Sequence, residues 1–67
     1  MVKFDDVKDY IYEDVSVGLQ HSVIPNRLFY YYGFLEEAND EFIKIQMRNG
    51  VKQIPLNQIM EIKSRGR

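Results

Sequence analysis

Apolar residues near the N-terminus follow first a helical period and then a period of two. Over residues 3–13 they recur at helical spacing and share roughly one face, which also takes in Val2: Val2, Phe4, Val7, Tyr10 and Ile11. Asp5 or Asp6 is placed to cap the start of this segment. Over residues 14–22 apolar and small or polar positions alternate. The pattern therefore predicts a short helix over 3–13 and a half-buried strand over 14–22.

Two more strands are predicted in the middle of the chain. Residues 27–36 are too aromatic and β-prone for a helix, and Pro25-Asn26 before them is a turn signal. Gly33 lies inside this segment, where a glycine often marks a bend or a close approach of two backbones. Residues 41–48 alternate between aliphatic and polar side chains. Both segments are predicted to be strands, joined by a polar turn at residues 38–41.

The last third is predicted to form a hairpin and a final strand. Asn49-Gly50 favours a type I′ turn, in which both residues have positive φ. Pro55 has no N–H to donate and should end a strand over 51–55. Residues 56–58 would form one 3₁₀ turn before a strand over 59–63. The elements together predict a mainly β fold, a five-stranded, strongly bent barrel of the SH3-like type with a short N-terminal α-helix.

The size and composition of the chain limit how it gains stability. Its 67 residues form a single predicted domain, 1–67, and a chain this short buries only about 60% of its unfolded surface. There is no cysteine, which excludes disulfides and thiolate zinc sites, and the one histidine, His21, has no carboxylates spaced to share a metal. We therefore expect no metal and no cofactor, and we expect a homo-oligomer, since association is the remaining means of stabilisation.

Composition also bears on the cellular location. The chain is 45% hydrophobic and 28% charged, the balance of a folded soluble domain. No apolar run approaches the ~20 residues of a membrane span. The N-terminal residues include acidic side chains where a signal peptide has its apolar core. The sequence therefore predicts a cytoplasmic protein that does not enter a membrane.

Once the strands are placed, the chain resembles the Sm-like family of Sm, LSm and Hfq proteins. The residues that carry the resemblance to its two motifs are Gly33, Leu35, Asn39, Asp40, Ile43 to Ile45, Ile54, Asn57, Ile59 and Ile62. The family also places a helix before its first strand. The resemblance implies a ring in which the fourth strand of one subunit pairs with the fifth strand of the next. The oligomer interface implied here comprises Val51, Ile54, Ile59 and Ile62.

The chain departs from the family at the residues that bind RNA. Ile43 occupies the place where Sm proteins usually have an asparagine, and Pro55 and Leu56 occupy the place of an arginine and a glycine. The lysine-histidine pair of Hfq has no counterpart. The usual uridine-binding residues are therefore not carried over to this chain. The segment IPLNQI also resembles the last turn of PRC-barrel domains, where the same pattern serves packing.

Catalysis is not expected. Ser22 and His21 are neighbours on a predicted strand, so their side chains point to opposite faces and do not touch. No cysteine offers a nucleophile. The early acidic residues are interpreted as a solvated face, with binding of a metal or a basic partner as the lesser alternative: Asp5, Asp6, Asp9, Glu13 and Asp14. The sequence thus predicts a non-enzymatic protein.

Aromatic rings lie on both faces of the predicted strand 27–36. One face carries Leu28, Tyr30, Tyr32 and Phe34, and the other carries Phe29, Tyr31 and Leu35. In a small barrel one face is the core and the other is normally polar. The outer rings would then be covered by the helix, by a neighbouring subunit, or by nucleic-acid bases, which stack on exposed tyrosines. All three coverings are compatible with the sequence.

Charge is distributed unevenly along the chain. Residues 1–20 carry two basic and five acidic side chains, a balance of −3, whereas residues 44–67 carry six basic side chains and Glu61, a balance of +5. This asymmetry fits head-to-tail complementarity or contact of the basic C-terminal segment with phosphates. We predict weak binding of RNA or another nucleic acid, and the residues predicted to bind are Arg27, Tyr30, Tyr31, Tyr32, Arg48, Lys63, Arg65 and Arg67. The alternative is a protein-interaction or scaffold barrel that binds no nucleic acid.

Overall fold

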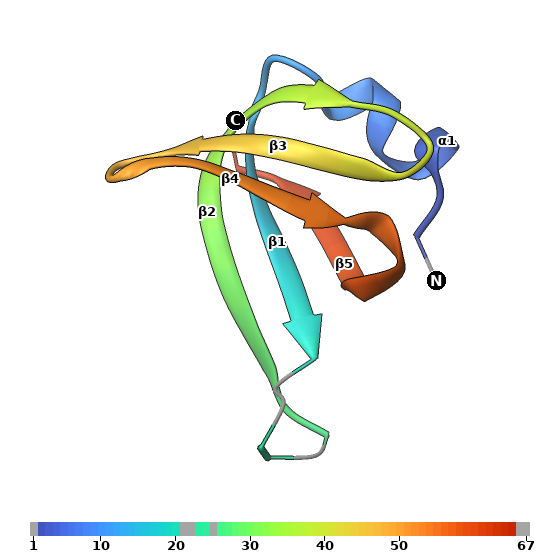
Figure 1. The fold of residues 1–67 in the computed structure, drawn as a ribbon, viewed down its shortest axis with the longest axis vertical. Coiled ribbons are helices and arrows are strands. Elements are labelled where there is room, and N and C mark those ends of the chain that lie inside the picture. The colour runs from blue at the N-terminus through green and yellow to red at the C-terminus, as the bar shows by residue number, and fades with distance from the viewer. Residues whose placement is uncertain (1, 21–22, 25, 66–67) are drawn as a thin grey trace.

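The computed structural model describes residues 2–20, 23–24 and 26–65. The chain begins with helix α1 (Phe4–Val7) and the 3₁₀ helix η1 (Lys8–Tyr10), and then forms one antiparallel sheet (Figure 1). The strands are β1 (Asp14–Gln20), β2 (Leu28–Ala38), β3 (Phe42–Met47), β4 (Gly50–Pro55) and β5 (Ile59–Ser64), and the 3₁₀ turn η2 (Leu56–Gln58) precedes β5. The predicted mainly β class, N-terminal helix and five strands are confirmed, and each strand end lies within two residues of its predicted position.

The N-terminal helical segment is shorter than the predicted span 3–13. It ends at Tyr10, because Tyr12 adopts a left-handed backbone conformation with φ 71° that a helix does not continue through. The carboxylate of Asp6 accepts a hydrogen bond of 2.9 Å from the backbone N–H of Lys3 at the start. Val7 is fully buried, and the other predicted apolar residues of this face also pack against the core. The predicted helix face is therefore confirmed.

Strand β2 is shared by the two halves of the sheet, whose strand order is β4-β3-β2-β1-β5. Residues 28–34 of β2 pair with β1, and residues 34–38 pair with β3, with a register shift between Leu35 and Glu37. Phe34 lies opposite both Asp14 and Gln46, at the point where β2 leaves one neighbour for the other. Figure 1 shows the resulting long curve of β2. This curve turns the β3–β4 half of the sheet over the β1–β5 half.

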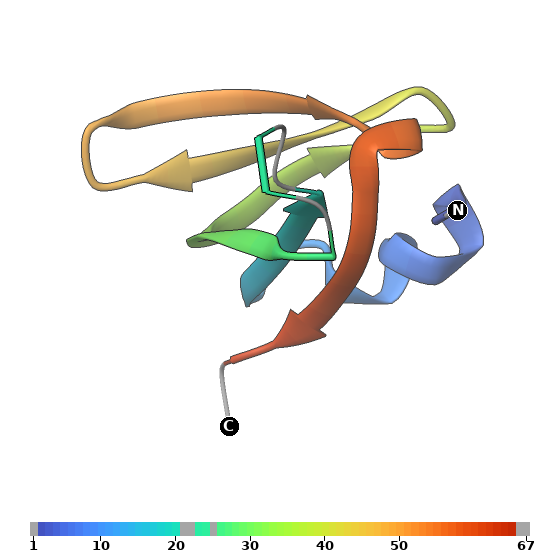
Figure 2. The same cartoon turned by 90° about the horizontal axis from the view of Figure 1, so that it is seen from below.

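The predicted closed barrel is wrong, because the sheet is open. Among the described residues β4 pairs only with β3, and β5 pairs only with β1. Pro55 ends β4 as predicted and has no N–H for further pairing. The predicted 3₁₀ turn follows it and buries Leu56 beneath the sheet. Figure 2 shows that β5 runs away from β4 after this turn, so these two strands remain edges.

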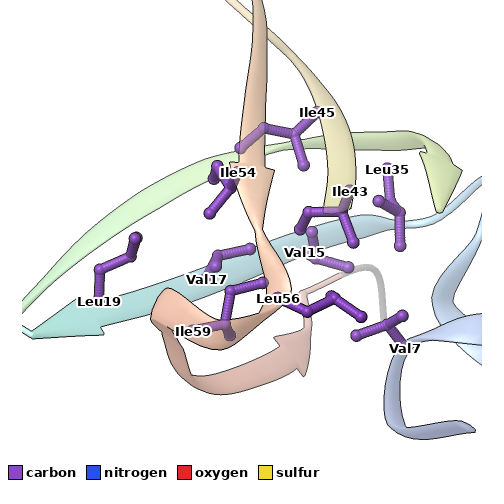
Figure 3. Close-up of a cluster of buried hydrophobic side chains, with 10 residues drawn as sticks. All are labelled: Val7, Val15, Val17, Leu19, Leu35, Ile43, Ile45, Ile54, Leu56 and Ile59. Carbon is purple, nitrogen blue, oxygen red and sulfur yellow. The ribbon is translucent and has the colours of Figure 1, made fainter. Parts of the chain in front are cut away.

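The core lies on the concave side of the bent sheet. It is entirely aliphatic and draws on α1, η2 and all five strands: Val7, Val15, Val17, Leu19, Leu35, Ile43, Ile45, Ile54, Leu56 and Ile59 (Figure 3). Leu19 lies at one end of this cluster and Val7 at the other. Burial of each such side chain stabilises the fold by about 1.5–3 kcal/mol before conformational entropy is counted. One continuous core thus holds every element in place.

The turn between β3 and β4 differs from the predicted type I′ turn. Met47 pairs with Gly50, so Arg48 and Asn49 form the two-residue loop. Neither of these two residues has a positive φ, whereas Gly50 has φ +133°. A glycine at the fourth position suits a type I turn, in which the two central residues stay in ordinary backbone regions. The hairpin is confirmed, and its predicted turn type is wrong.

Gly33 allows β2 and β3 to approach closely. A Cβ atom added there would lie 2.7 Å from the backbone carbonyl oxygen of Gln46 and 3.2 Å from Cγ of Met47. The carbonyl belongs to the neighbouring strand and does not rotate away as a side chain does. The close approach predicted from the glycine is therefore confirmed, and it falls next to the point where β2 changes partners.

Gly33→Ala should lower the free energy of unfolding by about 1–3 kcal/mol, because the methyl group forces two paired backbones apart. Urea denaturation followed by circular dichroism measures this loss. Gly18→Ala is the matched control, since its added Cβ would meet the movable ring of Tyr30, at 2.8 Å from Cε1. A loss at Gly33 no larger than the loss at Gly18 would contradict the backbone explanation.

Candidate nucleic-acid interface

Four aromatic rings form a row on the outer, convex side of β2. Their exposed fractions are 72% for Tyr12, 39% for Phe34, 52% for Tyr32 and 40% for Tyr30. Tyr12 stacks on Phe34, and Tyr32 stacks on Tyr30, each pair with ring centroids 6.3 Å apart and planes within 23°. We call these four residues the outer aromatic row. Its rings are exposed, so the N-terminal helix, one of the three coverings that the sequence allows, does not bury this face.

The neighbouring strand β1 makes room for these rings. Ser16 lies opposite Tyr32, and Gly18 lies opposite Tyr30. Both β1 residues are buried, and the ring edge of Tyr30 reaches the space that a side chain at position 18 would fill. Small residues on β1 therefore let the tyrosine rings of β2 lean over the sheet, where part of their surface stays in solvent.

Tyr12 enters the row from outside the sheet. Its backbone N–H donates to the carbonyl of Leu35 at 2.6 Å, and the N–H of Leu35 donates to the carbonyl of Glu13 at 2.9 Å. These two bonds hold the connection between η1 and β1 against β2, next to Phe34. The left-handed φ of Tyr12 costs a residue with a Cβ roughly 1–2 kcal/mol. Periodicity gives no sign of this conformation, so the sequence did not predict Tyr12 as a site residue.

A basic side chain from the end of the chain lies over the row. The guanidinium carbon of Arg65 is 4.7 Å from the ring centroid of Tyr32, within cation–π distance. The backbone N–H of Arg65 donates to the carbonyl of Asp14 at 2.7 Å, which fixes the chain at this point. The structure thus brings together three of the residues predicted to bind nucleic acid: Tyr30, Tyr32 and Arg65.

Other charges share this face. Lys63 lies opposite Ser16 in the sheet, on the side of β1 away from Tyr32, and its ammonium is 3.4 Å from the carboxylate of Glu61. Asp14 is exposed at the Phe34 end of the row. The face therefore carries both signs of charge, and its attraction for phosphate is local and modest.

The remaining predicted binding residues are not gathered at the row. Tyr31 points to the inner face, where the ammonium of Lys52 lies 5.0 Å from its ring centroid. Arg27 precedes β2, and Arg48 is in the β3–β4 turn, both exposed. Arg67 lies outside the described residues, as do His21 and Ser22. The predicted set is thus divided between two faces and two connections.

The residues predicted at an oligomer interface are also divided. Val51 on β4 is 52% exposed, and Ile62 on β5 is half-buried. Ile54 and Ile59 have their side chains in the core, with at most 1% exposed. An interface along these edge strands would therefore use their backbone groups and their exposed residues. The predicted interface stays a prediction.

The described residues contain neither a cluster of metal-ligating side chains nor a helix that could span a membrane. In residues 2–20, 23–24 and 26–65 no three His, Cys, Asp or Glu side chains are grouped so as to hold a metal ion. Within the same residues no helix has the length and apolar character needed to cross a membrane. Comparison of the chain with protein-family models, curated proteins and solved structures found no match.

The backbone conformation of Tyr12 can be tested with two substitutions that both remove its ring. Asparagine tolerates the left-handed region and alanine does not, so Tyr12→Asn should be more stable than Tyr12→Ala by roughly 1 kcal/mol. Thermal and urea denaturation of the two variants measure the difference. Equal stabilities would show that residue 12 is not left-handed in solution.

Proposed function

We propose that this protein is a non-enzymatic module of the Sm-like type that binds single-stranded RNA or another single-stranded nucleic acid weakly through the outer aromatic row. The observation that carries the proposal is the stack of Arg65 on Tyr32 within a row of four exposed rings. Bases stack on aromatic side chains and on guanidinium planes, and the bases of single strands are free to do so. The row offers both kinds of surface side by side.

The geometry of the row favours a strand that lies along β2. Three of the rings come from alternate residues of β2, and Tyr12 adds a fourth ring beside Phe34. The stacking surfaces therefore follow a line. A single strand can place successive bases along such a line, whereas the paired bases of a duplex are stacked on one another and hidden. Selection among the four bases is weak under this proposal, because every base has a π-face.

The charge of the face explains why binding should be weak. The whole chain has a net charge of −1, and acidic Asp14 and Glu61 lie beside the basic Lys63 and Arg65 on this side. Few phosphate contacts mean a shallow dependence of the affinity on salt. Stacking then supplies most of the binding free energy, and the basic side chains orient the strand.

Replacement of Tyr32 tests the stacking directly. Tyr32→Leu keeps an apolar side chain and removes the π-face, and it should weaken binding of a short oligonucleotide by about 1–3 kcal/mol. Tyr32→Phe keeps the ring and should bind like the unmodified protein. Fluorescence anisotropy with labelled U-rich and A-rich strands measures both affinities at low and moderate salt.

Asn49→Ala is the control for this experiment, since it removes an exposed, uncharged side chain of the β3–β4 turn, outside the row and away from the edges proposed for assembly. Arg65→Ala should remove about one phosphate contact. The slope of the logarithm of the affinity against the logarithm of the salt concentration should then become shallower by about one. Absence of binding even at low salt would reject the proposal and favour a protein-interaction or scaffold role for the exposed rings.

We further propose that copies of the chain assemble through the two free edges, β4 and β5. Unpaired edge strands expose rows of N–H and C=O groups that pair with another chain. Among the described residues neither edge is covered by another element of the sheet, and Val51 and Met60 are exposed on them. The small core gives a reason for the assembly, since each subunit alone has little stability in reserve.

Light scattering coupled to size exclusion tests the assembly. At tens of micromolar the protein should show a mass that is a multiple of the 8.0 kDa of one chain. Val51→Lys combined with Met60→Lys should reduce this mass to that of the monomer, because charges on an edge strand prevent pairing. Tyr32→Leu, on the outer face, should leave it unchanged. A strict monomer for the unmodified protein would reject the assembly and leave the stacking proposal standing.

A further inference from the structure

Leu19 lies at the end of the core away from Val7 of α1 (Figure 3). The concave side of the sheet is hollowed beside Leu19. Two cavities of about 140 and 450 Å³ meet there and share Leu19, Phe29 and Gln58 as lining residues. Ligand sites in proteins measure roughly 300–1,000 Å³, and the larger of these two cavities falls within that range. We call this region the inner mouth and define it by Leu19, Phe29, Tyr31, Lys52, Asn57 and Gln58.

Aromatic rings line the inner mouth. Phe29 lies opposite Leu19 in the sheet, lines both cavities and is 38% exposed. Its ring meets that of Tyr31 edge to face, with centroids 5.6 Å apart and an angle of 75°. These rings come from the residues of β2 that alternate with the outer aromatic row, so they lie on the opposite face of the strand. The inner mouth therefore has its own surface for a flat, apolar ring.

The ammonium group of Lys52 also lies at the inner mouth. Lys52 lies opposite the fully buried Ile45 and two residues before the buried Ile54, so it projects on the core side of edge strand β4. Its ammonium group is 5.0 Å from the ring centroid of Tyr31. This position sets a positive charge beside the rings. An anionic group of a ligand at the inner mouth would be attracted to it.

Besides Lys52 and the hydroxyl group of Tyr31, the polar side chains at the inner mouth are amides. Gln58 lines both cavities, Asn57 lines the larger one and Gln53 the smaller one. No carboxylate is among the described residues that line them. A third cavity, which shares Asn57 with the larger one, differs, since Asp5, Asp40 and Glu41 line it together with Lys3. Amides both donate and accept, which suits the hydrogen-bonding edge of a nucleobase, and the lack of carboxylates suits a phosphate.

We propose that the inner mouth binds a nucleoside monophosphate group. The base stacks on Phe29, the amides of Asn57 and Gln58 hydrogen-bond its edge, and Lys52 pairs with the phosphate. Such a group is available as a free nucleotide or as the 5′-phosphorylated end of an RNA strand. This site does not depend on the outer aromatic row, because the two lie on opposite faces of β2.

Adenosine monophosphate is the first probe, titrated into the ¹⁵N-labelled protein. It should shift the side-chain amide signals of Asn57 and Gln58. Adenosine, which lacks the phosphate, should bind about tenfold more weakly, and ribose 5-phosphate, which lacks the base, should shift nothing. A 5′-phosphorylated oligoadenylate that binds more tightly than the mononucleotide would identify the strand end as the ligand, and the reverse order would identify the free nucleotide.

Two variants assign the contacts. Lys52→Gln should weaken the monophosphate about tenfold and leave adenosine unchanged, because only the phosphate contact is lost. Phe29→Leu should weaken both about tenfold, because both stack. Lys52 is exposed, so Lys52→Gln is expected to fold even where Phe29→Leu does not.

Tyr32→Leu is the matched control on the other face and should leave the affinity for the monophosphate unchanged. Loss of that affinity in Tyr32→Leu, with Phe29→Leu unaffected, would place the nucleotide on the outer aromatic row and overturn the inner site. Absence of any amide shift with either the mononucleotide or the phosphorylated strand would overturn it as well. The proposed function is tested separately, by the affinity for oligonucleotides without a 5′-phosphate. Failure of the inner site and failure of the proposed function can therefore be distinguished.

Discussion

The structure depends on the change of partner along β2. A single sheet can bury an aliphatic core only if it bends, and β2 bends because its first part pairs with β1 and its last part with β3. Gly33 permits this at the crowded point, where its missing Cβ leaves room for the carbonyl of Gln46. The register shift after Leu35 completes the turn. Every buried contact between the two halves of the sheet follows from this bend.

The same strand sets the two faces that bear the proposed sites. Because successive side chains of a strand point to opposite sides, Tyr30 and Tyr32 lie outside, and Phe29 and Tyr31 lie inside. Each face then receives one cation from a distant strand or strand end: Arg65 lies over Tyr32, and Lys52 lies over Tyr31. One aromatic segment thus supplies two separate aromatic surfaces, which single substitutions can distinguish.

Patterns among residues that are close in the sequence predicted most of the fold but only part of the candidate site. The alternation over β1 and β3, the stop at Pro55 and the 3₁₀ turn after it follow from neighbouring residues, so they were predictable. The turn at Arg48 and Asn49 was not, because the same Asn-Gly pair fits more than one hairpin type and strand register decides between them. Tyr12 was missed because a left-handed tyrosine is held by hydrogen bonds to β2, far along the chain.

The sequence by itself determined the five strands, the apolar side of β1 and of β3, and the presence of rings on both faces of β2. These properties follow from periodicity and from the backbone limits of glycine and proline, which are local. Only the tertiary structure decided that the sheet stays open, that Arg65 stacks on Tyr32 and that Lys52 points inward. Those outcomes depend on register and on the bend of β2, since contacts between residues distant in sequence are made only when the whole core forms.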